Sequence, residues 1–213
     1  NLFFKSSIGY NSSLALYRMN YNEVLSASYA GAKVINMSWT SGCEFNIYQQ
    51  QAINEVYENG SFLIAAAGNG WTCGGSDSLV YPAAYDQVFS VTSIGENDNH
   101  ERTAGDPTST HQHNATIDLS APGYEVYISP SQDWEMKGSG TSYAAPFVAG
   151  TVALIHAINP CLSNDDIAYI LKSTSVNIDD LNPSYAGLIG EGRLNAAAAV
   201  EMAEGFNAIA LLP

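Results

Sequence analysis

The sequence has few positive charges, few cysteines and no long hydrophobic run. Seven Lys and Arg residues stand against 21 Asp and Glu residues in 213, so the formal net charge is −14. Such a surface repels polyanions, which argues against nucleic acid or an anionic membrane as a partner. Three cysteines are too few for a disulfide scaffold. No apolar stretch approaches the roughly 20 residues of a membrane span, so we expect none.

The composition favours one folded domain. Hydrophobic residues make up 46% of the chain, and a chain of this length buries roughly 70% of its unfolded-state surface. Because we find no repeat, low-complexity tract or linker, we expect residues 1–213 to form a single domain. The first residue is Asn1, without the layout of a signal peptide. A processed, truncated or partly removed N-terminal region is therefore an open expectation.

Short apolar runs alternate with helical patterns along the chain. This alternation predicts right-handed βαβ crossovers and a mainly parallel sheet. Two polar, irregular segments are interpreted as surface loops, at 96–116 and 123–137. The predicted strands are 13–18, 33–37, 61–67, 88–94 and 117–119, and the predicted helices are 20–31, 45–59, 144–158, 163–173 and 195–205.

In parallel sheets the functional residues gather at the carboxyl ends of the strands. One candidate there is Ser142, which is surrounded by small residues and precedes the long apolar helix. The dipole and free N–H groups of a helix start favour developing negative charge. Pro146 has no N–H to donate to the carbonyl of Ser142, so the helix ladder is interrupted there. These features fit a nucleophile as well as they fit a simple helix cap.

A second candidate is Asn69, which follows an apolar strand and is flanked by Gly68 and Gly70. Its amide can donate to an oxyanion. Taken alone, the residues are more typical of an Asn-Gly turn.

Together these segments resemble the subtilisin-like serine proteases, or subtilases. The nucleophile motif of that family, G-T-S-x-A-x-P, matches Gly140–Pro146, and its oxyanion motif, A-A-G-N, matches Ala66–Asn69. Further family signatures follow in the expected order, at 32–38, 81–83, 120–123 and 190–196. The resemblance covers about 11–204 and implies an α/β fold of three αβα layers with a mainly parallel sheet.

The resemblance also implies roles for individual residues. Ser142 would attack a peptide carbonyl, while Asn69 and the N–H of Ser142 would hold the oxyanion. Trp39 stands where the family usually has an aliphatic residue, so it would narrow the pocket unless it faces the core. We expect no cofactor and no metal, since no Asp-rich loop has calcium-binding spacing. The implied substrate-binding residues are Ser38, Trp39, Thr40, Ala67 and Gly68.

The motifs that carry the Asp and His of a subtilase triad, D-[ST]-G and H-G-T-x-x-A-G, do not occur in the sequence. We therefore expect the C-terminal part of a longer catalytic domain, inactive alone. Its own N-terminal segment or another copy of the chain would be its partner at an unpaired sheet edge. Two alternatives use His111 and His113: a local base oriented by Asp118, or a metal site with Asp106 or His100. The fourth histidine, His156, is expected to be structural.

Cys43 and Cys73 follow two strand ends that would be neighbours in the sheet. We predict a disulfide between them beside the cleft, with Cys161 unpaired. A disulfide, an acidic surface and protease chemistry together predict a secreted or cell-envelope protein.

The sequence thus predicts a serine endopeptidase acting on peptides or proteins. The alternative is a catalytically inactive subtilase-like module that binds peptides or protein partners. The presence of both Ser142 and Asn69 favours the enzyme, because binding needs neither. An esterase of the α/β-hydrolase type is disfavoured, since its G-x-S-x-G motif would need Gly where Ala144 stands.

Overall fold

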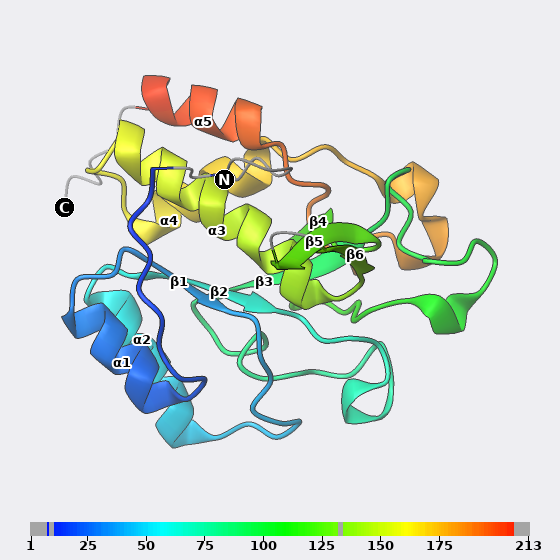
Figure 1. The fold of residues 1–213 in the computed structure, drawn as a ribbon, viewed down its shortest axis with the longest axis horizontal. Coiled ribbons are helices and arrows are strands. Elements are labelled where there is room, and N and C mark those ends of the chain that lie inside the picture. The colour runs from blue at the N-terminus through cyan, green and yellow to red at the C-terminus, as the bar shows by residue number, and fades with distance from the viewer. Residues whose placement is uncertain (1–7, 9–10, 132–133, 207–213) are drawn as a thin grey trace.

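The computed structural model describes residues 8, 11–131 and 134–206. Its centre is a sheet of four parallel strands in the order β1-β2-β3-β4. Helices α1 and α2 cover one face of this sheet, and α3, α4 and α5 cover the other (Figure 1). This architecture confirms the predicted three-layer α/β fold. The strands are β1 (Val34–Met37), β2 (Phe62–Ala66), β3 (Val88–Ile94) and β4 (Leu119–Pro122).

The two faces of the sheet bury different sets of side chains. On one face, Leu63 and Ala65 of β2 pack in a cluster with α1 (Tyr21–Tyr29) and α2 (Ile47–Glu58). On the other face, Ile64 and its neighbours in β2 pack against α3 (Thr141–Ile158), α4 (Asn164–Ser173) and α5 (Ala196–Gly205). Because β2 is buried on both faces, its sequence is apolar throughout rather than alternating.

Most helices begin at a side chain that the sequence marks as a cap. Asn20 accepts from the N–H of Glu23 at 3.0 Å, and Asn195 accepts from Ala198 at 3.2 Å. Ser163 and Asp166 form a complete capping box at the start of α4. Each contact spans three residues, so the starts of these helices depend on local sequence alone.

The expected strand at 13–18 is absent, and this prediction was wrong. The segment forms no strand, and Leu14 and Leu16 are 90% and 96% exposed. An alternating apolar pattern makes a strand only where a neighbouring strand completes the hydrogen bonds. Among the described residues β1 pairs with β2 alone, so it forms one edge of the sheet.

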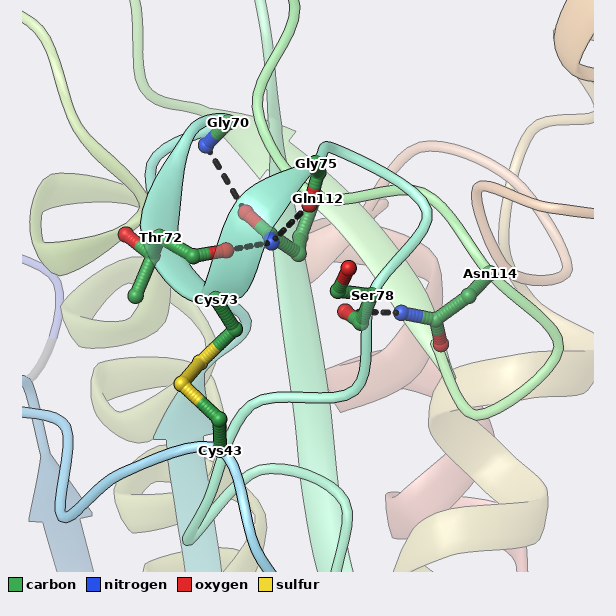
Figure 2. Close-up of a disulfide and its surroundings, with 8 residues drawn as sticks. All are labelled: Cys43, Gly70, Thr72, Cys73, Gly75, Ser78, Gln112 and Asn114. Atoms are coloured by element: carbon green, nitrogen blue, oxygen red, sulfur yellow. Dashed lines mark hydrogen bonds between the residues drawn. A yellow bond between two sulfur atoms is a disulfide. The ribbon is translucent and has the colours of Figure 1, made fainter.

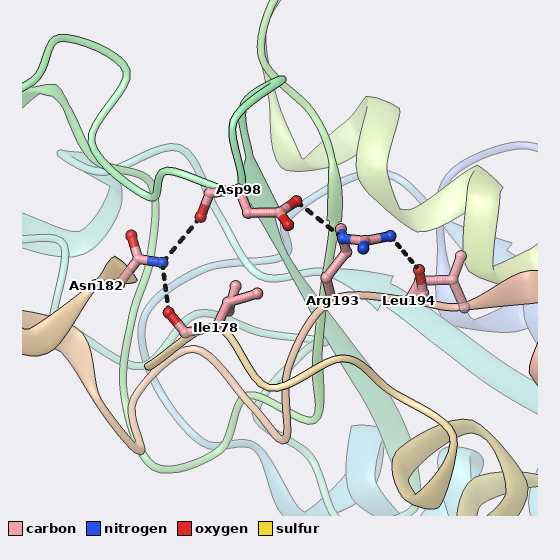
Figure 3. Close-up of polar contacts among 5 residues, drawn as sticks. All are labelled: Asp98, Ile178, Asn182, Arg193 and Leu194. Carbon is pink, nitrogen blue, oxygen red and sulfur yellow. Dashed lines mark hydrogen bonds and ion pairs between the residues drawn. The ribbon is translucent and has the colours of Figure 1, made fainter. Parts of the chain in front are cut away.

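The other edge of the sheet is covered by the chain before α5. The N–H of Ser120 in β4 donates to Gly192 at 2.8 Å, and Leu194 donates back to Ser120 at 2.8 Å. Figure 3 shows how this segment is held: Arg193 Nε lies 2.9 Å from Asp98 Oδ1, and the amide of Asn182 donates to the Asp98 carbonyl at 2.9 Å. β4 therefore starts two residues later than predicted and continues to Pro122.

The segment 123–137 is a second correction, because it is not an irregular loop. It contains an antiparallel hairpin of β5 (Val126–Ser131) and β6 (Trp134–Gly138), with Val126 opposite Gly138. Beside it, Lys137 Nζ and Glu125 Oε2 form an exposed ion pair at 2.9 Å. Both strands contain β-favouring residues, among them Tyr127, Ile128 and Trp134, but the Ser, Pro and Asp residues between them are typical of a loop and led to the loop prediction.

Helix α3 starts at Thr141, three residues before the predicted start, so Ser142 lies in its first turn. By length and composition alone α3 could cross a membrane. It packs against all four strands of the parallel sheet, and the core helix of a globular protein passes the same test.

Candidate active site

Ser142 is the second residue of α3, which follows the extended N-cap residue Gly140. The N–H of Gly140 donates to the Gly123 carbonyl at 2.8 Å and so ties the helix start to the end of β4. In the first turn of a helix the N–H groups lack intrahelical acceptors. No atom of the described residues accepts a hydrogen bond from the N–H of Ser142. This N–H and the positive end of the helix dipole therefore remain available to an anion.

The orientation of the Asn69 amide is determined by Thr141. The backbone N–H of Thr141 lies 2.9 Å from Asn69 Oδ1, and Thr141 Oγ1 lies 3.1 Å from the same oxygen. Because a backbone N–H can only donate, the atom facing it must be the amide oxygen. The NH₂ of Asn69 therefore points away from Thr141. It is exposed and has no acceptor in the described part of the chain, so it can donate to a developing negative charge.

Thr141 links this amide to the end of β2. Its hydroxyl accepts from the N–H of Gly68 at 3.1 Å while it donates to Asn69 Oδ1. The sequence interpretation did not select Thr141 as a site residue. Its place inside the G-T-S motif was the one available signal, since the contact with Gly68 spans 73 positions.

Ser38 and Ser142 hydrogen bond to each other in both directions. Ser142 Oγ donates to the Ser38 carbonyl at 3.4 Å, and Ser38 Oγ donates to the Ser142 carbonyl at 3.1 Å. The second bond satisfies the carbonyl of Ser142, which has no helix donor because Pro146 has no N–H. Ser38 replaces the missing helix donor, while Asn36 donates to Ser38 Oγ at 2.9 Å.

The remaining predicted pocket residues lie in the segments that follow β1 and β2. Ala67 and Gly68 are buried at the end of β2, and Thr40 is exposed after β1. The ring of Trp39 is half-buried and packs edge-on against Tyr21, with 5.3 Å between centroids. It joins the cluster beneath α1 and α2. Trp39 thus faces the core, which was the alternative to a role in narrowing the pocket.

A disulfide joins the loops that follow β1 and β2 (Figure 2). It connects Cys43 to Cys73, and Cys161 is an exposed free thiol. In the first loop, two residues before Cys43, the N–H of Ser41 donates to the Tyr81 carbonyl at 2.7 Å. The two loops beside Ser142 are therefore held to each other covalently and to the segment before β3 by hydrogen bonds.

The comparisons with known proteins agree with this geometry. The Subtilase family model matches residues 6–197, which is most of the chain. The chain belongs to the subtilase family. Over 175 residues it is 33% identical to Subtilisin DY of Bacillus licheniformis, covering 82% of this chain and 59% of that protein. Over 180 residues it is 33% identical to Thermitase of Thermoactinomyces vulgaris, covering 84% and 58%. The chain thus spans less than two thirds of these curated relatives.

Solved structures have the same fold. A protease from Pseudoalteromonas arctica PAMC 21717 superposes with a TM-score of 0.68 at 29% identity, over 86% of this chain and 57% of that one. The Patellamide maturation protease PatA superposes with a TM-score of 0.71 at 25% identity, over 88% and 68%.

Two histidines of this subtilase chain, His100 and His113, hydrogen bond to each other and not to Ser142. The buried His100 ring donates from Nδ1 to the Ser93 carbonyl at 3.1 Å, because a carbonyl can only accept. Its Nε2 then accepts from Nδ1–H of His113 at 3.1 Å. Burial lowers the pKa of both His100 and His111 to about 4, so both rings are neutral at pH 7. In the described residues no histidine hydrogen bonds to Ser142.

Both alternatives built on His111 and His113 therefore lack support. Asp118 does not orient either ring: it forms an ion pair with Lys172 at 2.5 Å and accepts from the N–H of Ser90 at 2.7 Å. The alternative of a local base therefore finds no support in this geometry. Across the described residues no group of three or more His, Cys, Asp or Glu side chains is placed to hold a metal ion. His156 lies fourteen residues along α3 from Ser142, which is about 21 Å at the rise of an α-helix.

Proposed function

We propose that the protein is a serine endopeptidase that hydrolyses peptide bonds through an acyl-enzyme on Ser142. One observation carries the proposal: Thr141 fixes the Asn69 amide with its NH₂ free, beside a serine in the first turn of α3. A module that only binds peptides needs neither a nucleophile nor an oriented oxyanion donor.

The reaction follows from these groups. A general base removes the proton from Ser142 Oγ as this oxygen attacks the carbonyl carbon of the substrate. The carbonyl oxygen becomes an oxyanion, which accepts from the Asn69 NH₂ and from the N–H of Ser142. The C–N bond then breaks, and the departing amine takes the proton from the base. Water repeats the attack on the ester, which releases the acid and restores Ser142.

The substrate would bind in an extended conformation along the two loops joined by the disulfide. Ser38, Trp39 and Thr40 would pair with the peptide backbone. Ala67 and Gly68 would wall the pocket for the side chain that precedes the cleaved bond. The contact between Ser38 and Ser142 supports this arrangement, since it brings the end of β1 to the nucleophile. Trp39 would brace the wall from the core through Tyr21.

We infer that the general base and its orienting carboxylate reach Ser142 from the protein's own N-terminal segment or from another copy of the chain. The engagement of His100 and His113 with each other supports this inference. Two observations are compatible with docking: β1 is an edge strand among the described residues, and Leu14 and Leu16 are exposed. With that segment, residues 1–213 would complete one catalytic domain, and without it the chain would be inactive.

We also propose that the protein works outside the cytoplasm, either secreted or in the cell envelope. The disulfide between Cys43 and Cys73 supports this, because such bonds persist in oxidising compartments. The excess of acidic residues is compatible with an exported protein.

A fluorophosphonate probe tests the proposal. In the intact protein, meaning the full-length product that contains these residues, we expect labelling at Ser142. The Ser142→Ala variant and the isolated 213-residue chain should not label. A folded intact protein that binds peptides without labelling would instead be the inactive binding module. Strong labelling of the isolated chain would show that its base lies within these residues.

A further inference from the structure

Gln112 lies beneath the loop that carries Asn69, and its side chain has no exposed surface. Figure 2 shows its amide between three backbone groups of that loop. The N–H of Gly70 donates to Gln112 Oε1 at 2.7 Å. Gln112 Nε2 donates to the carbonyls of Thr72 at 3.0 Å and Gly75 at 2.8 Å. The partners can only donate or only accept, so the amide has one possible orientation.

The backbone of Gln112 holds the loop as well. Its N–H donates to the Gly68 carbonyl at 3.2 Å, so Gln112 binds both chain neighbours of Asn69. The packing is close: a Cβ added to Gly68 would lie 2.9 Å from Gln112 Oε1, and one added to Gly70 would lie 2.4 Å from the Thr110 carbonyl. Both glycines have positive φ, of 119° and 79°. The loop therefore rests directly on residues 110–112.

We propose that Gln112 is a positioning residue for the oxyanion donor Asn69. By fixing the backbone on both sides of Asn69, it aims the amide NH₂ at the place where the oxyanion forms. The inference rests on the proposed function of Asn69. The disulfide cannot replace this restraint, because Cys73 is attached three residues beyond Gly70. One planar side chain must supply one acceptor and two donors here, which an apolar or an ionised side chain cannot do.

Loss of the Gln112 amide leaves one N–H and two carbonyls without partners in a buried place, so the loop relaxes. Misplacement of a reacting group by about 1 Å can lower a rate roughly 100-fold. For Gln112→Ala in the intact protein we expect kcat to fall about 10- to 100-fold, with KM changed less than about twofold, because the oxyanion exists only in the transition state.

A double-mutant cycle separates positioning from general destabilisation. If Gln112 acts through Asn69, Gln112→Ala should lower kcat by less than about threefold in an Asn69→Ala background. An equal loss in both backgrounds would overturn the inference.

The chain offers a matched control in Gln50, which is also buried. Its amide accepts from the N–H of Asp86 at 3.0 Å and donates to the Asp86 carbonyl and to Asn54. Gln50 lies on α2, outside the loop that carries Asn69. We expect Gln50→Ala to lower stability without lowering kcat. A matching fall in kcat for this control would mean that the Gln112 effect is unspecific.

A Gln112→Glu variant tests hydrogen bonding separately from packing, because the two side chains have nearly the same volume. When protonated, the introduced carboxyl can accept from Gly70 and donate to one carbonyl; when ionised, it faces two carbonyl oxygens. Burial and these oxygens raise its pKa. The kcat of this variant relative to the original protein should therefore rise as the pH falls. A ratio independent of pH would contradict the proposal.

A structural measurement keeps the inference independent of activity. In a crystal structure of the Gln112→Leu variant, we expect the Asn69 amide to be displaced or present in more than one conformation. An unchanged Asn69 amide would overturn the inference even in an inactive protein. Failure of the original protein to label at Ser142 would instead overturn the proposed function.

Discussion

The stability of the protein should decrease between pH 6.5 and pH 4 because His100 and His111 are buried as neutral rings. Burial lowers the pKa of each from 6.5 to about 4. The geometry at His100 agrees: its Nε2 accepts from His113, so a proton at Nε2 would face the N–H of that ring. In the folded state both rings therefore stay neutral down to a pH of about 4, whereas in the unfolded chain each imidazole takes up a proton near its ordinary pKa of 6.5.

The magnitude follows from the linkage between protonation and folding. Between the two pKa values the unfolded state binds more protons, so the free energy of unfolding falls as the pH falls. Each such imidazole contributes about 1.4 kcal/mol per pH unit across this window. For His100 the window from 6.5 to about 4 amounts to about 3 kcal/mol. This contribution is complete above pH 6.5 and is lost as the pH approaches 4.

Urea denaturation of the intact protein at several pH values between 4.5 and 7 tests the reasoning. The His100→Gln variant should show a shallower dependence of the unfolding free energy on pH, by about 1.4 kcal/mol per pH unit. His156→Gln is the control, since this ring is only half-buried at the end of α3 and should change the slope less. An unchanged slope in His100→Gln would refute the argument, as would an NMR titration of the folded protein that places His100 near pH 6.5.

Two further predictions concern the loops beside Ser142. Replacing Cys43 and Cys73 by Ser removes a cross-link between residues 30 positions apart, so urea denaturation should show a loss of about 3–4 kcal/mol from the unfolding free energy; an unchanged midpoint would contradict the link. Thr141→Val removes the hydroxyl that donates to Asn69 and accepts from Gly68. It should lower kcat of the intact protein about tenfold with little effect on KM, and unchanged kcat on a chromogenic peptide would contradict the role of Thr141.

For comparison, removal of one oxyanion donor in subtilisin, a member of this family, lowers kcat by about 10²–10³-fold. The smaller effect expected for Thr141→Val reflects that the Asn69 amide stays in place and loses one of its two restraints. The backbone N–H of Thr141 still donates to Asn69 Oδ1 in that variant.

Predictions from the sequence succeeded where the signal was local. The caps at Asn20 and Ser163 act over three residues, and β3 has its predicted bounds because its β-branched and aromatic residues favour a strand, which is buried along its whole length. They failed where a partner distant in sequence decides the outcome. The segment 13–18 has a strand-like pattern but no neighbouring strand among the described residues. The hairpin of β5 and β6 consists of two short β-favouring runs around loop-type residues, and only the pairing of the two runs makes them strands.

The site shows the same division. The pattern His-x-His drew attention to His111 and His113, whereas the residue between them, Gln112, contacts the loop of Asn69. No periodicity or motif marks Gln112, because its partner Gly70 is 42 positions away. Equally, Pro146 indicated that the carbonyl of Ser142 lacks a helix donor, but nothing local showed what replaces it.

The sequence by itself determined the family, the strands of the parallel sheet and the helices α1 to α5, and its motifs marked Ser142 and Asn69, since short motifs and periodic patterns encode these locally. The tertiary structure alone decided the orientation of the Asn69 amide, the donation from Ser38 to Ser142 across 104 positions, and the clamp formed by Gln112. Each of these depends on which backbone groups meet at the carboxyl ends of parallel strands, and that meeting is settled only when the sheet and α3 pack together.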